Sequence, residues 1–178
     1  MADLKATPAV GGLPETLGSV TLSLAGPALV TSIAPFPGAD VNPALATLGL
    51  TMPAAGTMNA QGAARILWAG RDMAFLMGAD APDGLAAEAA LTDQSDGWVW
   101  MHLSGADAAA VLARLTPLDL RDSALPVGAV ARSMINHMQA IVLRPLPEVY
   151  ELAVFRSMAS TLKHELIEAM KAVAARAA

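Results

Sequence analysis

The pattern of apolar and polar residues predicts two strands and a helix near the start of the chain. Apolar residues alternate with Thr and Ser from Val20 to Leu24, and an apolar run from Ala28 to Ile33 lies between two prolines, as is typical of short strands. Apolar residues then recur at helical spacing from Val41 to Leu48. Because Pro43 suits the first turn of a helix and Gly49 suits its end, we expect a helix here.

The same pattern predicts a hairpin and two further extended segments later in the chain. The runs Ala63–Trp68 and Met73–Met77 flank the turn-forming sequence Ala69-Gly70-Arg71-Asp72, which predicts a β-hairpin. Residues 90–91 and 98–103 are rich in apolar side chains and are expected to be extended.

The last third of the chain predicts a helix, two long strands and a terminal helix. Ser104 is the expected N-cap of a helix that Pro117 ends. Residues 129–143 and 150–155 are expected to form long strands, and Ser157 to open an amphipathic helix with Leu and Met on one face.

The order of these elements repeats along the chain. Gly38-Ala39-Asp40 matches Gly105-Ala106-Asp107, and each comes between a strand and a helix. This order predicts an α+β fold of two similar β-α-β-β lobes packed together with a C-terminal helix. We expect one domain over residues 15–178, with lobes at about 15–85 and 86–178, and a flexible N-terminal arm over residues 1–14.

The composition is apolar and poor in charge. Of the 178 residues, 54% are hydrophobic and 15% are charged, against about 25% charged in ordinary soluble domains. A membrane protein, a dry interior or a surface covered by other chains would each explain this. The uncharged stretches 16–39 and 41–64 are interrupted by Gly and Pro, so neither predicts a membrane span, and no secretory signal is visible. Zero cysteine agrees with a cytoplasmic location.

The charge is slightly acidic and unevenly spread. Lys and Arg total 11 and Asp and Glu total 16, a net charge of −5, and the arginines are scattered singly, so nucleic acid is not an expected partner. The segment 1–64 carries charge only at Asp3, Lys5, Glu15 and Asp40. Such a segment fits a surface that another chain covers, and it fits equally a structural segment rich in Gly, Ala and Pro.

No catalytic or cofactor-binding motif is recognisable. The sequence has no Gly-rich phosphate loop and no nucleophile elbow. Asp93 and Asp96 lie three residues apart beside Trp98, and two such carboxylates could act as a general acid and base. A turn in which the Asp and Ser side chains hydrogen bond to their own backbone is the better interpretation of this segment. We therefore expect no catalytic, cofactor or metal site. The three histidines lack the short spacing of metal ligands: His102, His137 and His164.

Several short motifs lie along the chain. They are Leu48-Gly49-Leu50-Thr51-Met52-Pro53, Leu67–Leu76, Asp93-Gln94-Ser95, Leu103-Ser104-Gly105-Ala106-Asp107, Pro117-Leu118-Asp119-Leu120 and Tyr150–Ser157. Together they resemble the gamma subunit of heterotetrameric sarcosine oxidase over roughly residues 15 to 175. That subunit is similar in turn to the folate-binding part of the glycine-cleavage aminomethyltransferases.

The resemblance implies a two-lobed α+β fold and a noncatalytic structural role. In such complexes sarcosine is oxidised at FAD in the beta subunit, and electrons pass through FMN to oxygen, forming hydrogen peroxide. The one-carbon group goes to tetrahydrofolate in the alpha subunit, which also holds NAD, while zinc lies in the delta subunit. The alpha, beta and delta subunits are thus the implied partners. Where aminomethyltransferases carry an Asn-containing folate segment, this chain has residues 155–160 without Asn.

Two other functions remain open. A related complex that oxidises another N-methyl amino acid, such as N-methylglutamate, could contain a homologous subunit. A stand-alone folate-binding one-carbon protein would place Asp93, Asp96 or Arg132 near its ligand. If the chain is a covered subunit, we expect residues 1–64 to be the covered part and the isolated chain to expose an apolar patch.

Overall fold

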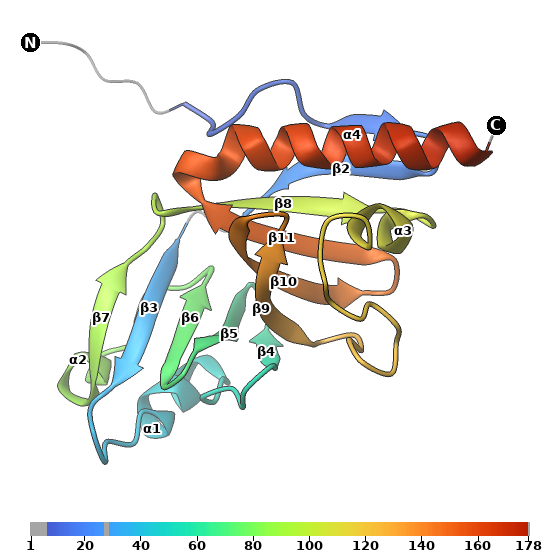
Figure 1. Cartoon of the computed structure of the whole chain (residues 1–178). Helices are drawn as coiled ribbons and strands as arrows, with labels where there is room; N and C mark the ends of the chain where they lie inside the picture. The colour runs from blue at the N-terminus through green and yellow to red at the C-terminus, as the bar shows by residue number, and fades with distance from the viewer. Residues whose placement is uncertain (1–6, 27–28, 178) are drawn as a thin grey trace, which may run out of the picture.

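Two antiparallel sheets form the body of the computed structural model, which describes residues 7–26 and 29–177 (Figure 1). One sheet, here called sheet A, contains β1 (Glu15–Leu17), β2 (Val20–Ala25), β8 (Trp98–Ser104), β9 (Val130–Ile135), β10 (Met138–Leu146) and β11 (Val149–Phe155). Sheet B contains β3 (Val30–Pro35), β4 (Met58–Gln61), β5 (Ala64–Gly70), β6 (Met73–Met77) and β7 (Ala89–Asp93). The strand orders are β1-β2-β8-β11-β10-β9 and β4-β5-β6-β3-β7.

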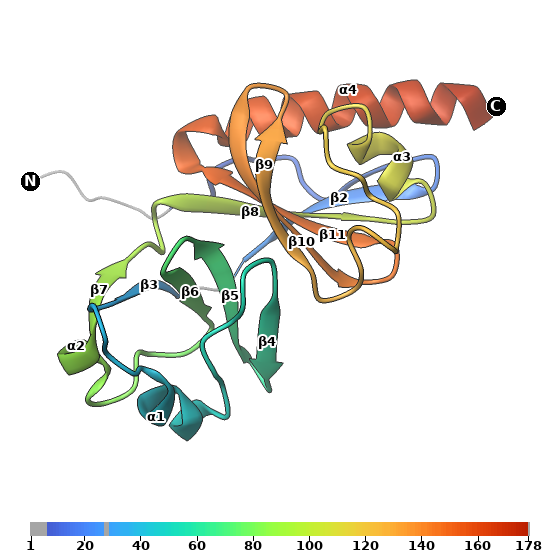
Figure 2. The same cartoon turned by 60° about the horizontal axis from the view of Figure 1, so that its bottom comes forward.

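Helices cover the outer face of each sheet, unequally. The long helix α4 (Ala159–Ala177) and the short α3 (Ala108–Leu112) pack on sheet A, where they share one apolar core with its strands. Sheet B is covered by α1 (Asn42–Leu45), η1 (Ala46–Leu48) and α2 (Leu85–Glu88). A single 3₁₀ turn, η2 (Arg156–Met158), leads from β11 into α4. In Figures 1 and 2, α1 and α4 lie at opposite ends of the molecule.

A third core lies between the two sheets. Trp98 and Trp100 of sheet A pack there with Phe75 and Met77 of sheet B. The rings of Phe75 and Trp98 meet edge to face, with centroids 5.6 Å apart. Such aromatic pairs stabilise a contact beyond the area that they bury, so this core holds the sheets in one arrangement.

The chain passes between the sheets at two neighbouring places. It leaves sheet A after β2 to enter β3, and it returns from β7 to β8. The two passages are hydrogen bonded, because Gln94 N donates to Val30 O at 2.8 Å and Val30 N donates to Ser95 Oγ at 3.0 Å. The predicted lobe limits at residues 85 and 86 therefore do not separate the sheets, since β1 and β2 pair in sheet A and β7 pairs in sheet B.

The α+β class and most predicted elements are confirmed. Two antiparallel sheets and the C-terminal helix are present, and the hairpin of β5 and β6 turns at Arg71-Asp72. The first predicted helix is present as α1 and η1, and Gly49 ends it in the left-handed conformation at φ 68°. Of the strand expected over 28–33, Ala28 lies outside the described residues.

Two local predictions were wrong. Ser104 is not an N-cap: it belongs to β8, and the cap position is Asp107, whose carboxylate instead accepts a hydrogen bond from Ser19 Oγ at 2.5 Å. Residues 129–143 are not one strand, because the chain turns back at Asn136-His137 between β9 and β10. Asn136 has a φ of 48°, a conformation that Asn tolerates better than most residues, and this was the overlooked turn signal.

The N-terminal segment contacts η2 and α4 from residue 7 onward. Val10 is buried in the core of sheet A and α4, and Lys163 Nζ donates to Gly11 O at 2.8 Å. Arg156 donates to Thr7 O at 2.9 Å. Residues 1–6 of the predicted arm lie outside the described residues. Among the helices that the structure describes, none is long and apolar enough to cross a membrane.

Candidate functional site

The acidic pair singled out from the sequence lies in a turn between β7 and β8. Asp93 Oδ1 accepts hydrogen bonds from Ser95 Oγ at 2.6 Å and from Ser95 N at 2.9 Å. These bonds lower the pKa of the Asp93 carboxyl, the side-chain bond being the stronger cause. Asp96 is exposed in the same turn, and Gly97 N closes it on Gln94 O at 3.0 Å. The interpretation as a turn is confirmed.

Arg132 does not join that pair. It lies on β9, and its Nη1 donates to Ala69 O of sheet B at 2.7 Å. Two strands, β11 and β10, separate β8 from β9. Three strand spacings amount to about 14 Å, so Arg132 and Asp96 face no common small ligand across the sheet.

The histidines also lie apart. His102 is on β8, His137 is exposed in the turn after β9, and His164 is exposed on α4. Within residues 7–26 and 29–177, no group of three His, Asp or Glu side chains is placed to hold a metal ion.

One buried ionic cluster joins the two sheets. Glu151 of β11 is only 4% exposed and accepts hydrogen bonds at 2.7 and 2.6 Å from both terminal nitrogens of Arg65 on β5. His102 Nε2 lies 2.9 Å from Glu151 Oε1. Burial acts to raise the pKa of Glu151, but the bonds from His102 and Arg65 outweigh it and lower this pKa to about 2. Glu151 is therefore a fixed anion that anchors Arg65 of sheet B to sheet A.

Sequence reasoning missed this cluster, although it left a signal. Arg65 and Glu151 each interrupt an apolar strand, and charged side chains are rarely buried unless they are paired. That signal predicts a partner but not its identity, because the two residues lie 86 positions apart in the chain.

A second buried cation holds the loop that carries the Pro-Leu-Asp-Leu motif. Arg144 of β10 donates from Nη1 to Asp122 Oδ1 at 2.5 Å and to Leu125 O at 3.0 Å. Within the loop, Asp119 accepts from the backbone N of Arg121 at 3.1 Å and also pairs with the Arg121 guanidinium. The bonds from Arg121 lower the pKa of Asp119 to about 2. The motif thus shapes and fastens a loop.

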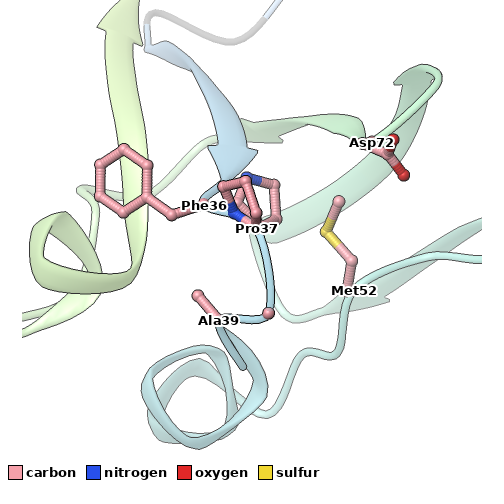
Figure 3. A pocket seen from close by; sticks show the side chains of 7 residues that line it. Phe36, Pro37, Ala39, Met52 and Asp72 are labelled. Atoms are coloured by element: carbon pink, nitrogen blue, oxygen red, sulfur yellow. The ribbon is translucent and has the colours of Figure 1, made fainter.

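A cavity of about 460 Å³ (Figure 3) opens next to α1, at the end of the molecule opposite α4 (Figure 1). Phe36 stands at its rim with 45% of its surface exposed, and Asp72 is its one charged lining residue. A second hollow of about 290 Å³ shares Met52 and Asp72 with the first. The first cavity is lined by Pro35, Phe36, Pro37, Gly38, Ala39, Met52 and Asp72. This lining offers apolar contact and one carboxylate.

Large apolar side chains are exposed elsewhere as well. The β10 end and the β11 end of sheet A each contribute such residues, so the apolar surface is distributed over both sheets. The exposed large apolar residues are Leu24, Phe36, Val127, Met134, Leu146, Phe155 and Met158. The expected association of the isolated chain through an apolar patch stays a prediction.

The fold and these sites define a two-sheet α+β protein whose buried charges fasten its sheets and loops. Residues 35–171 match the model of the "Sarcosine oxidase, gamma subunit family", and the chain therefore belongs to this family. Among solved structures, 24 chains match. One of them, from the heterotetrameric sarcosine oxidase of Corynebacterium sp. U-96 in complex with pyrrole 2-carboxylate, has a TM-score of 0.76 and 22% identity, covering 90% of this chain and 88% of that chain. The likeness shows that the fold is shared. No curated protein matches.

Proposed function

We propose that this chain is a noncatalytic structural subunit of a heterotetrameric sarcosine oxidase. Such a complex oxidatively demethylates sarcosine to glycine, transfers the one-carbon group to tetrahydrofolate and forms hydrogen peroxide. The observation that carries the proposal is membership of the gamma subunit family over residues 35–171. The fold shared with a chain of a heterotetrameric sarcosine oxidase supports it.

The hydrogen bonds that the polar residues make within the chain also support a structural role. Asp93 caps a turn, Arg132 ties β9 to β5, and Glu151 ties sheet A to sheet B. Each of these groups already has a protein partner, so none is held ready for a substrate.

The segment that would correspond to the folate-holding part of aminomethyltransferases is engaged within the chain. Phe155 packs on Trp98 with ring centroids 4.6 Å apart, and Arg156 donates to Thr7 O. Residues 155–160 contain no Asn. These residues do not fit a folate site, so the proposal derives no step through folate in this chain.

The proposal places FAD, FMN, NAD, tetrahydrofolate and zinc in other subunits and makes the alpha, beta and delta subunits the partners. It places the complex in the cytoplasm. In this complex the gamma chain contributes contact surface and leaves the chemistry to its partners.

Copurification tests the proposal. The tagged chain, expressed from its native host together with the neighbouring genes, is expected to recover flavoprotein subunits in equal molar amounts and sarcosine-dependent peroxide formation. Recovery of the chain free of flavoprotein would contradict the proposal. The same complex assayed with sarcosine and with N-methylglutamate distinguishes the two possible substrates.

A ligand titration tests the folate alternative. We expect tetrahydrofolate to leave the Trp fluorescence and the melting temperature of the isolated chain unchanged, because ligand binding to the folded state would raise that temperature. Saturable quenching with a rise in melting temperature would favour a stand-alone folate-binding protein.

A further inference from the structure

Methionine carries all the sulfur of this chain, which has ten methionines and no cysteine. A peroxide oxidises methionine to its sulfoxide, and it must reach the lone pair on the sulfur to do so. Met1 lies outside the described residues. The other nine methionines differ widely in exposure, so the fold makes them unequal targets for an oxidant.

Four methionines are sealed inside the cores. Each has an exposed fraction of 4% or less: Met77, Met101, Met138 and Met170. Met101 and Met170 belong to the core of sheet A and α4, and Met77 belongs to the core between the sheets. An oxidant reaches such a sulfur only when the chain opens locally. Three more are half-buried, namely Met52, Met58 and Met73.

Two methionines are exposed, Met134 at 39% and Met158 at 42%. Met134 lies on β9, an edge strand of sheet A whose neighbour in the sheet is β10. Met158 ends the 3₁₀ turn η2, which has no buried residue. Both lie outside the three apolar cores of the described residues. Their thioethers are therefore open to an oxidant in the folded chain.

We propose that Met134 and Met158 are modification sites, which hydrogen peroxide converts to methionine sulfoxide while the chain stays folded. The sulfur lone pair attacks one peroxide oxygen, so that an S–O bond forms and the O–O bond breaks. The hydroxide that leaves takes up the proton of the transferred oxygen and becomes water. Sulfur is oxidised and the peroxide is reduced, so the step needs no further reactant.

The positions of the two residues make this change tolerable. A sulfoxide is polar, and inside a core it would disrupt the packing. At Met134 and Met158 water hydrates the new oxygen, because both side chains are exposed. The pairing of Met134 with Gln139 in the sheet uses the backbone and not the thioether. Oxidation at these sites is also reversible, because methionine sulfoxide reductases restore the thioether.

Peptide mass spectrometry of the isolated chain after brief exposure to dilute hydrogen peroxide tests the sites. We expect Met134 and Met158 to gain oxygen at least about tenfold faster than Met101 and Met170, because the buried sulfurs wait for local opening. The same four residues should oxidise at similar rates in a chain unfolded by urea. Similar rates in the folded chain, or faster oxidation of the buried residues, overturn the proposal.

Matched variants give a second readout. The double variant Met134→Leu with Met158→Leu keeps the apolar volume and should lose the fast uptake of oxygen. Met101→Leu should retain it, and both variants must melt as the wild-type chain does. Wild-type chain oxidised only in the fast phase should melt within about 2 °C of the untreated chain. A larger fall would show that the change is not tolerated and would overturn that part of the proposal.

The source of the peroxide within the cell rests on the proposed function. A complex that oxidises sarcosine and forms hydrogen peroxide would supply the oxidant in the same assembly. We expect turnover of the co-expressed complex with sarcosine to oxidise Met134 and Met158, and catalase to prevent it. Peroxide formation without oxidation at either residue overturns the proposal for the assembled protein. A complex that forms no peroxide overturns the proposed function instead and leaves the result for the isolated chain standing.

Discussion

The outer faces of the two sheets are covered in different ways. On sheet A, the 19-residue helix α4 buries Leu162, Leu166 and Met170 and presents charged residues to solvent. On sheet B, α1 and α2 have four residues each. Leu45 of α1 and Leu166 of α4 are both fully buried, so each helix contributes a side chain to the core beneath it.

The difference therefore lies in the surface and not in the core. Helices of four residues have no stability of their own, so α1 and α2 depend on packing against sheet B. The exposed residues of α1 and η1 are uncharged, whereas exposed charged residues lie along α4.

The largest expected effect tests whether both interiors are equally packed. Leu166→Ala and Leu45→Ala should each destabilise the isolated chain by about 2–5 kcal/mol, because each removes a fully buried side chain and leaves a cavity. Urea denaturation measures both. A loss below about 1 kcal/mol for Leu45→Ala alone would show that the end of sheet B is loosely packed until a partner covers it.

A second effect concerns the joint between the sheets. Glu151 has its pKa lowered from 4.5 to about 2, so its charge stabilises the fold fully above pH 4.5. That contribution, on the order of 3 kcal/mol, is lost as the pH falls from about 4.5 to 2, because protonation removes the bonds to Arg65 and His102. Thermal unfolding across this pH range measures it.

Glu151→Gln is the control for the acid transition. The variant should be less stable than the wild-type chain at pH 7 and lose less further stability between pH 4.5 and 2. The exposed carboxyl of Asp119, whose pKa is also lowered, titrates in both proteins and cancels in the difference. Identical pH profiles for the two proteins would rule out Glu151 as the source.

The smallest expected effect on stability comes from substitutions on the exposed sides of η1 and α4. Ala46→Lys on η1 and Ala175→Lys on α4 both add a cation at an exposed position, so each should change the free energy of unfolding by no more than about 0.5 kcal/mol. Urea denaturation measures both variants. A loss above about 1 kcal/mol for either one would contradict the expected tolerance of that exterior.

Local features of the fold could be predicted from the sequence because they depend on near neighbours. The hairpin of β5 and β6 and the left-handed Gly49 follow from residues a few positions apart. The turn at Asn136 was overlooked because the flanking residues read as one continuous apolar strand. Ser104 has the chemistry of an N-cap, but pairing with Val149 and Thr21 holds it in β8.

The sites were harder to predict for a physical reason. The structural use of Asp93 follows from Ser95 two residues later. The Arg65–Glu151 pair and the cavity of Phe36 and Asp72 require knowing which strands and loops become neighbours in space. Only the resemblance of short motifs to a known family supplied that information at the level of the whole fold, and it supplied none about the cavity.

The paired passages between the sheets affect how the protein is made. Thr21 of β2 pairs with Ser104 of β8, 83 positions later in the chain. At a synthesis rate of about 5–20 residues per second, β2 emerges from the ribosome roughly 4–17 s before its partner strand. During that interval an apolar strand has an open edge, and contacts of such long sequence separation form slowly. The yield of folded protein would therefore depend on how fast the second half of the chain is synthesised, or on a chaperone that binds the first half meanwhile.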